Sequence, residues 1–207
     1  MIIMKKIPVL FVLLLGLQFQ TSLMAQLQDH KDVVFTAWLN SAFNLIVVDG
    51  DIQTATFNTA DDYNTGVSET HGIVPGFTTV AMEATTNWNL KIHAADFSPV
   101  TGTGSIPINN LGVWCEATGI HQFGTEVKCL NTSIDASLGL TNTDLTLIDL
   151  LTDNSGDQTD NLFVLHWRMG TMNGSMNVQS MFKQLSDGLF SQGQYTTTVV
   201  LTMTEIP

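Results

Sequence analysis

The chain has 207 residues, of which 44% are hydrophobic, and a formal net charge of −12 at pH 7. That charge repels polyanions, which argues against nucleic acid and anionic membrane surfaces as partners. The length suits one globular domain with a core of its own.

The first residues have the order of a secretory signal peptide. Two lysines supply a positive start, residues 7–17 form an apolar run, and Ala25 offers a small residue for cleavage. The run is shorter than the roughly 20 residues that span a bilayer. We therefore expect residues 1–25 to be removed on export and residues 26–207 to form a single domain with no membrane span. A retained N-terminal anchor is the alternative.

Apolar side chains recur at every second position through much of the remaining chain. The alternation is clearest at 87–93, 161–169 and 195–205, where one face is apolar and the other polar. This period is that of a half-buried β-strand. Weaker strands of the same kind are expected at 33–39, 44–49, 54–58, 78–84, 112–117, 126–131, 134–138 and 145–150. Turn signals separate them, which predicts an all-β antiparallel sandwich, with an immunoglobulin-like strand order as one option.

One segment departs from this period. Apolar residues between positions 178 and 185 recur at helical spacing, with Ser175 or Asn177 as a cap and Gly188 as a stop. We expect one short helix there, packed over the edge of the sandwich.

The only cysteines are Cys115 and Cys129. An even pair in an exported protein predicts a disulfide, and closing a loop of about 15 residues stabilises by roughly 3 kcal/mol in the chain-entropy model. Two free thiols are the alternative. A zinc site is not expected, because two thiols without paired histidines are an incomplete ligand set.

Two segments resemble a known family. Residues 85–97 place Trp88 and Leu90 in a Trp-x-Leu strand, and residues 193–207 close the chain with a strand led by Gly-x-Tyr and ending in proline. Together they resemble the WxL domain, a β-rich bacterial surface domain with a second Trp-x-Leu in its last strand. Here Leu201-Thr202-Met203 stands at that second motif. The resemblance implies non-covalent attachment to the cell wall, with Trp88 and Leu90 as candidate contacts.

Signals of catalysis are few. No nucleophile elbow, zinc-protease helix or phosphate loop occurs in the sequence. His93 with Asp96 is one local pair and fits a solvated face, while His166 and Arg168 share the outer face of their strand. We expect no catalytic residue and no cofactor. A Ser/His/Asp site assembled in space is the alternative, because such sites are defined by geometry.

Asp153, Asn154, Asp157 and Asp160 form the candidate metal site. Calcium takes six to eight oxygen ligands from flexible loops, which these residues could supply. Their spacing is not that of an EF-hand, and the same residue types are ordinary turn formers. Calcium is therefore the candidate ion, and ordinary turn formation is the alternative.

These features predict a non-catalytic bacterial protein that is secreted to the cell surface. Its role would be structural or adhesive, as a cell-wall-associated protein or a subunit of a surface assembly. The expected partners are cell-wall polymer, other surface proteins or further copies of itself. The alternative is a carbohydrate- or peptidoglycan-binding module, which requires a line of exposed aromatic rings.

Overall fold

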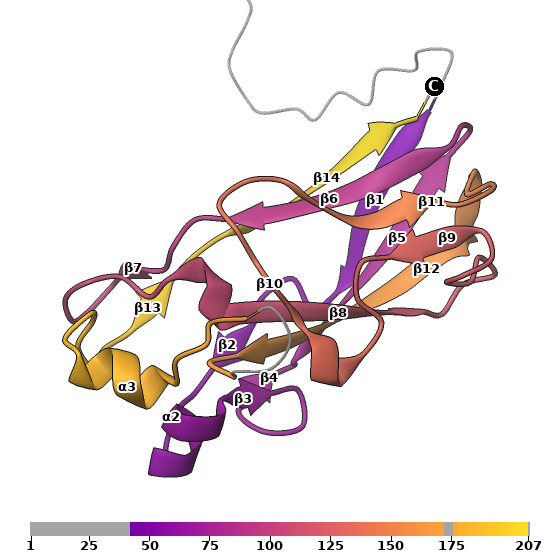
Figure 1. The fold of residues 1–207 in the computed structure, drawn as a ribbon. Helices are drawn as coiled ribbons and strands as arrows, with labels where there is room; N and C mark the ends of the chain where they lie inside the picture. The colour runs from indigo at the N-terminus through magenta and orange to yellow at the C-terminus, as the bar shows by residue number, and fades with distance from the viewer. Residues whose placement is uncertain (1–41, 172–175, 207) are drawn as a thin grey trace, which may run out of the picture. The chain divides into compact units, whose positions relative to one another are not determined.

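The computed structural model describes residues 42–171 and 176–206 (Figure 1). The chain divides into two units, Met1–Thr36 and Ala37–Pro207, and all described residues belong to the second. The expected leader and the expected strand at 33–39 lie outside the described residues. Within the described ranges, no helix is long and apolar enough to cross a membrane.

Antiparallel strands are the main regular structure of the described chain, which confirms the predicted all-β sandwich class. The strands are β1 (Phe43–Asp49), β2 (Thr54–Ala55), β3 (Val67–Ser68), β4 (Ile73–Val74), β5 (Phe77–Ala84), β6 (Trp88–Ala94), β7 (Ser98–Pro99), β8 (Leu111–Ala117), β9 (Val127–Cys129), β10 (Leu138–Gly139), β11 (Leu145–Leu150), β12 (Gly156–Met169), β13 (Tyr195–Thr196) and β14 (Val199–Glu205).

Two sheets carry the fold. The larger has the order β1-β5-β12-β8-β10, with β3 also paired to β12, and the smaller has the order β14-β6-β11-β9. Two short ribbons, β13-β7 and β2-β4, complete the pairing. An immunoglobulin constant domain has the orders A-B-E-D and C-F-G, which this arrangement does not reproduce.

Inward-facing apolar residues of both sheets share one core. Trp88 of β6 packs edge-on against Phe163 of β12, with ring centroids 6.1 Å apart. Along β6 the buried Trp88, Leu90 and Ile92 alternate with partly exposed polar residues. The two-residue period therefore separates the dry face of each sheet from the wet one.

The expected helix is present as α3 (Met181–Ser186). Its cap is Ser180, whose side chain accepts a hydrogen bond from the Lys183 amide, and not Ser175 or Asn177. The first turn therefore begins later than the apolar spacing predicted.

Three local predictions were wrong. A second helix, α2 (Ala60–Thr65), follows a capping box and was not expected. The segment predicted as a strand at 134–138 instead contains the 3-10 helix η3 (Ile134–Ala136), capped by the Ser133 side chain. The predicted final strand breaks into β13 and β14. A further 3-10 turn, η2 (Ile108–Asn110), precedes β8.

Candidate functional site

The Trp-x-Leu strand lies in the core. Trp88 and Leu90 are both 0% exposed. The Trp88 indole Nε1 donates to the Asn154 backbone carbonyl at 2.6 Å. The Asn154 side-chain amide accepts from the Trp88 backbone N–H at 3.0 Å and donates to the Trp88 backbone carbonyl at 2.8 Å. This burial corrects the expected wall contact, because a ring without exposed surface cannot touch a polymer. The motif is an internal anchor of the sandwich.

The candidate calcium ligands do not form a common site. Asp153 accepts bonds from the Ser155 amide and hydroxyl, and Asp157 accepts from the Thr159 amide at 2.7 Å. Asp160 accepts from the amide of Asp157. Among the described residues, no group of three or more His, Cys, Asp or Glu side chains could hold a metal ion. Asp153 shapes the loop before β12, and Asp157 and Asp160 bond each other's amides at the irregular start of that strand. The expected calcium site therefore does not form among the described residues.

The same backbone hydrogen bonds lower the pKa of two of these carboxylates. Hydrogen bonding from the Ser155 amide lowers the pKa of Asp153, and bonding from the Thr159 amide lowers that of Asp157. These local backbone bonds therefore favour the charged form of both carboxylates.

Each described histidine ring bonds to a carboxylate or an amide oxygen. The pairs are His71–Asp62 (2.7 Å), His93–Asp144 (2.7 Å), His121–Asn161 (3.0 Å) and His166–Glu69. His93 thus pairs with Asp144 and not with Asp96, whose carboxylate accepts from the Ile108 amide. Within the described chain, none of these rings has a hydrogen bond to a hydroxyl or thiol. The observed geometry is that of pairing with acidic or amide side chains, at a partly exposed position for His93 and at a largely buried one for His166.

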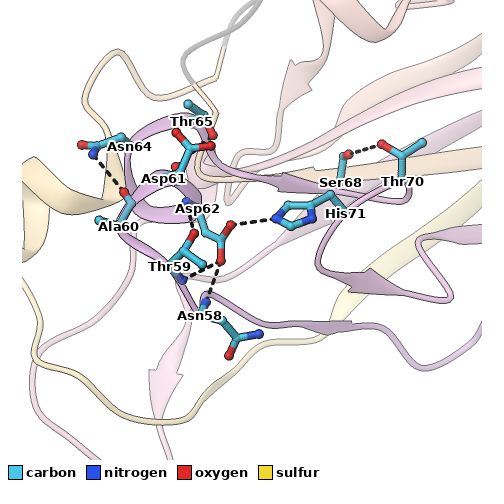
Figure 2. A network of polar contacts seen from close by, with 10 residues as sticks. All are labelled: Asn58, Thr59, Ala60, Asp61, Asp62, Asn64, Thr65, Ser68, Thr70 and His71. Carbon is cyan, nitrogen blue, oxygen red and sulfur yellow. Dashed lines mark hydrogen bonds and ion pairs between the residues drawn. The ribbon is translucent and has the colours of Figure 1, made fainter.

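The clearest polar network surrounds Asp62 at the start of α2 (Figure 2). One carboxylate oxygen meets His71 Nε2 at 2.7 Å, and the other accepts from the amides of Asn58 and Thr59 at 2.7 and 2.8 Å. The Thr59 hydroxyl in turn accepts from the Asp62 amide, which completes a capping box. These bonds, first that of His71, hold the pKa of Asp62 far below its usual range.

Ser68 lies near this network without joining it. Its hydroxyl pairs with Thr70 at 3.0 Å, while the His71 ring points toward Asp62 (Figure 2). The segment therefore holds serine, histidine and aspartate close together but not in the order of a catalytic triad. Its evident role is to fix α2 against the β3–β4 turn.

A second polar group lies on the outer face of the larger sheet. His166 of β12 stacks on Trp114 of β8, with ring centroids 3.9 Å apart and planes 7° apart. Its two ring nitrogens approach Glu69 and, at 3.4 Å, Glu116. Arg168 follows on the same face and donates to the carbonyl of Ile134 at 2.6 Å. Sequence reasoning found His166 and Arg168 but not their partners, because Glu69 is 97 residues from His166.

The two cysteines face each other across the sheets. Cys115 lies on β8 of the larger sheet and Cys129 on β9 of the smaller. Both are thiols in the structure. The disulfide stays a prediction and is developed below.

One side of the sandwich lies between β1 and β14. Among residues 42–171 and 176–206, each is the last strand of its sheet, with β5 and β6 as their respective neighbours. Ala42, beside β1, exchanges hydrogen bonds with Thr85, and Ile206, beside β14, donates to the Asn87 carbonyl at 2.9 Å. Since residues 85–87 link β5 to β6, the two edge strands lie on the same side of the sandwich.

Inward-facing residues of both edge strands are apolar but only partly buried. Val47 is in register with the buried Val80, so it faces the core, yet it is 44% exposed. Leu201 is in register with the buried Ile92 and is itself half-buried. Val48, at 54% exposure, adds to the apolar surface. We call this surface the open edge and define it by Phe43, Leu45, Val47, Val199, Leu201 and Met203.

The open edge has few of the features that protect sheet edges. Neither β1 nor β14 contains lysine or proline, and the one irregularity of β1 is a register shift between Val47 and Asp49. Unprotected edges present backbone donors and acceptors to any added strand. The open edge could therefore bind an extended segment through main-chain bonds and apolar contacts.

A scan against models of known protein families gave no match to this chain. A search of curated proteins gave none either.

Proposed function

We propose that this chain is a non-catalytic structural or adhesive protein of the bacterial cell surface, and that it acts as a subunit of a surface assembly. The observation that carries the proposal is the open edge, where two strands that end their sheets among the described residues leave inward-facing apolar residues partly exposed. Strand addition at such an edge is a recurrent way for β-proteins to bind another chain. Export rests on the leader pattern of residues 1–25.

The non-catalytic part of the proposal has its own support. The described histidines are paired with acidic or amide side chains, as given above. A general base needs hydrogen-bond reach to the proton that it removes. Histidines that are paired in this way hold strands and loops together and activate no neighbouring hydroxyl or thiol among the described residues.

A carbohydrate- or peptidoglycan-binding role has less support. Trp88 is buried, one face of the half-buried Trp114 ring is covered by His166, and Tyr63 packs against Phe57. No line of open aromatic faces is therefore offered by these residues. Wall association, if the WxL resemblance holds, would use another surface than the Trp88 ring.

Self-association measured against concentration tests the proposal. We expect the purified chain to form concentration-dependent oligomers in sedimentation velocity or light scattering. Val47→Lys places a charge on the inner face of the edge, which is a known way to block strand addition. It should weaken self-association at least about tenfold, which corresponds to roughly 1.4 kcal/mol.

The matched control is Ile120→Lys, because Ile120 is 64% exposed and follows β8, which β5 and β12 separate from β1 in the larger sheet. It should oligomerise like the parent chain. Circular dichroism checks that both variants fold. A parent chain that stays monomeric at millimolar concentration would refute self-assembly, and equal weakening by both variants would refute the role of the open edge.

A further inference from the structure

Cys115 and Cys129 meet where the chain crosses from one sheet to the other. The Asn131 carbonyl oxygen accepts from the Cys115 amide at 2.9 Å and from the Cys129 thiol at 3.1 Å. One oxygen atom therefore touches both cysteines, one on β8 of the larger sheet and one on β9 of the smaller. The Asn131 side chain also donates to the Val113 carbonyl of β8, which fixes the crossing point.

The two thiols differ in access to solvent. Cys115 is buried in the core, whereas Cys129 is partly exposed at the outer strand of its sheet. Burial, and then hydrogen bonding to the Cys129 thiol, raises the pKa of the Cys115 thiol. The thiolate is the reactive form of cysteine, so an oxidant from solvent should meet Cys129 first.

We propose that Cys115 and Cys129 are oxidised to a disulfide that joins the two sheets, and that Cys129 is the thiol that reacts first. The oxidant is a disulfide-bearing molecule, such as oxidised glutathione or a disulfide oxidoreductase. Cys129 loses its proton and attacks one sulfur of the oxidant, whose own disulfide breaks and leaves one thiol. Cys115 then loses its proton and attacks Cys129, which releases the second thiol. Two protein thiols are oxidised and one oxidant disulfide is reduced.

The bond would close the side of the sandwich opposite the open edge. In the smaller sheet β9 and β14 are the two end strands, and β14 is the one that lies on the same side of the sandwich as β1. The disulfide would thus fasten one side covalently while strand addition remains available on the other. It needs an oxidising compartment but does not depend on what the open edge binds.

Peptide mapping of the full chain tests the pairing. The chain is purified in reductant, treated with oxidised glutathione, alkylated, and digested without reduction. We expect one peptide pair joined through Cys115 and Cys129, and a melting temperature higher by about 6–12 °C than that of the reduced chain. Two fully alkylated cysteines after oxidation would overturn the proposal.

Single variants test the order of reaction. Cys115→Ala should leave Cys129 as a stable mixed disulfide with glutathione in the folded chain. Cys129→Ser should leave a Cys115 that is modified at least about tenfold more slowly until denaturant is added, because it is buried. Faster modification of Cys115 than of Cys129 in the folded chains would overturn the assigned order, and pairing in the parent chain is read independently of either variant.

Discussion

Replacing Asn154 by alanine should destabilise the fold far more than a loop substitution does. The amide bonds the Trp88 backbone N and O inside the protein, at 3.0 and 2.8 Å. Alanine leaves that N–H and that carbonyl without these partners in a site closed to water. An orphaned buried polar group costs about 1–3 kcal/mol, so the free energy of unfolding should fall by roughly 2–6 kcal/mol. The indole bond uses the Asn154 backbone and should survive.

Urea unfolding followed by tryptophan fluorescence measures this loss. Asn142→Ala, in an exposed loop, is the matched control and should stay within about 0.5 kcal/mol of the parent chain. Both variants are unfolded with calcium and with a chelator. A loss below about 1 kcal/mol for Asn154→Ala would refute the reasoning. A loss that appears only with calcium present would restore Asn154 as a metal ligand.

Three further outcomes follow from the polar contacts. Hydrogen bonding, first with His71, lowers the pKa of Asp62 in the folded chain below its ordinary value near 3.8. The charged carboxylate therefore stabilises the fold above that pH, and this stabilisation is lost as the pH falls toward the folded pKa. In Asp62→Asn, the urea concentration at the unfolding midpoint should therefore fall less steeply below about pH 4 than it does in the parent chain. Gln184→Ala should lower stability by about 2–3 kcal/mol in the same assay, because it removes paired buried amide bonds. Chelation should leave the melting temperature unchanged, because Asp153 and Asp157 bond to backbone amides; a shift of several degrees would contradict this.

The long strands could be predicted from the sequence because their pattern repeats. Trp88, Leu90 and Ile92 of β6 alternate with less buried neighbours, and so do Phe163, Leu165 and Trp167 of β12. A two-residue period over six or more residues indicates a half-buried β-strand, and several such strands indicate an all-β fold.

Short elements were harder because one side chain decides them. Ser133 caps η3 within a segment that reads as a strand, and Thr59 with Asp62 forms a capping box with an aspartate where glutamate is typical. In both cases a local side-chain hydrogen bond to the backbone decides the conformation, against the strand or loop propensity of the segment.

The candidate sites were predicted least well, because their partners are distant in sequence. Asn154 is 66 residues from Trp88, and its role as a core amide has the same sequence signature as a turn or a metal ligand. Glu69 and His166 likewise meet only through the pairing of β3 and β12. The residue types showed which side chains are polar. Which of these polar side chains contact one another could be read only from the fold.

The central position of β12 also determines when the domain can form. This strand begins at Gly156 yet pairs with β5 and β8, which precede it by some 40 to 80 residues, and β6 gains its β14 partner later still. Neither sheet can close while the ribosome is still making the first three quarters of the chain. Such non-local pairing slows folding and keeps the nascent polypeptide extended. The native sheets therefore form only after most of the domain has been synthesised.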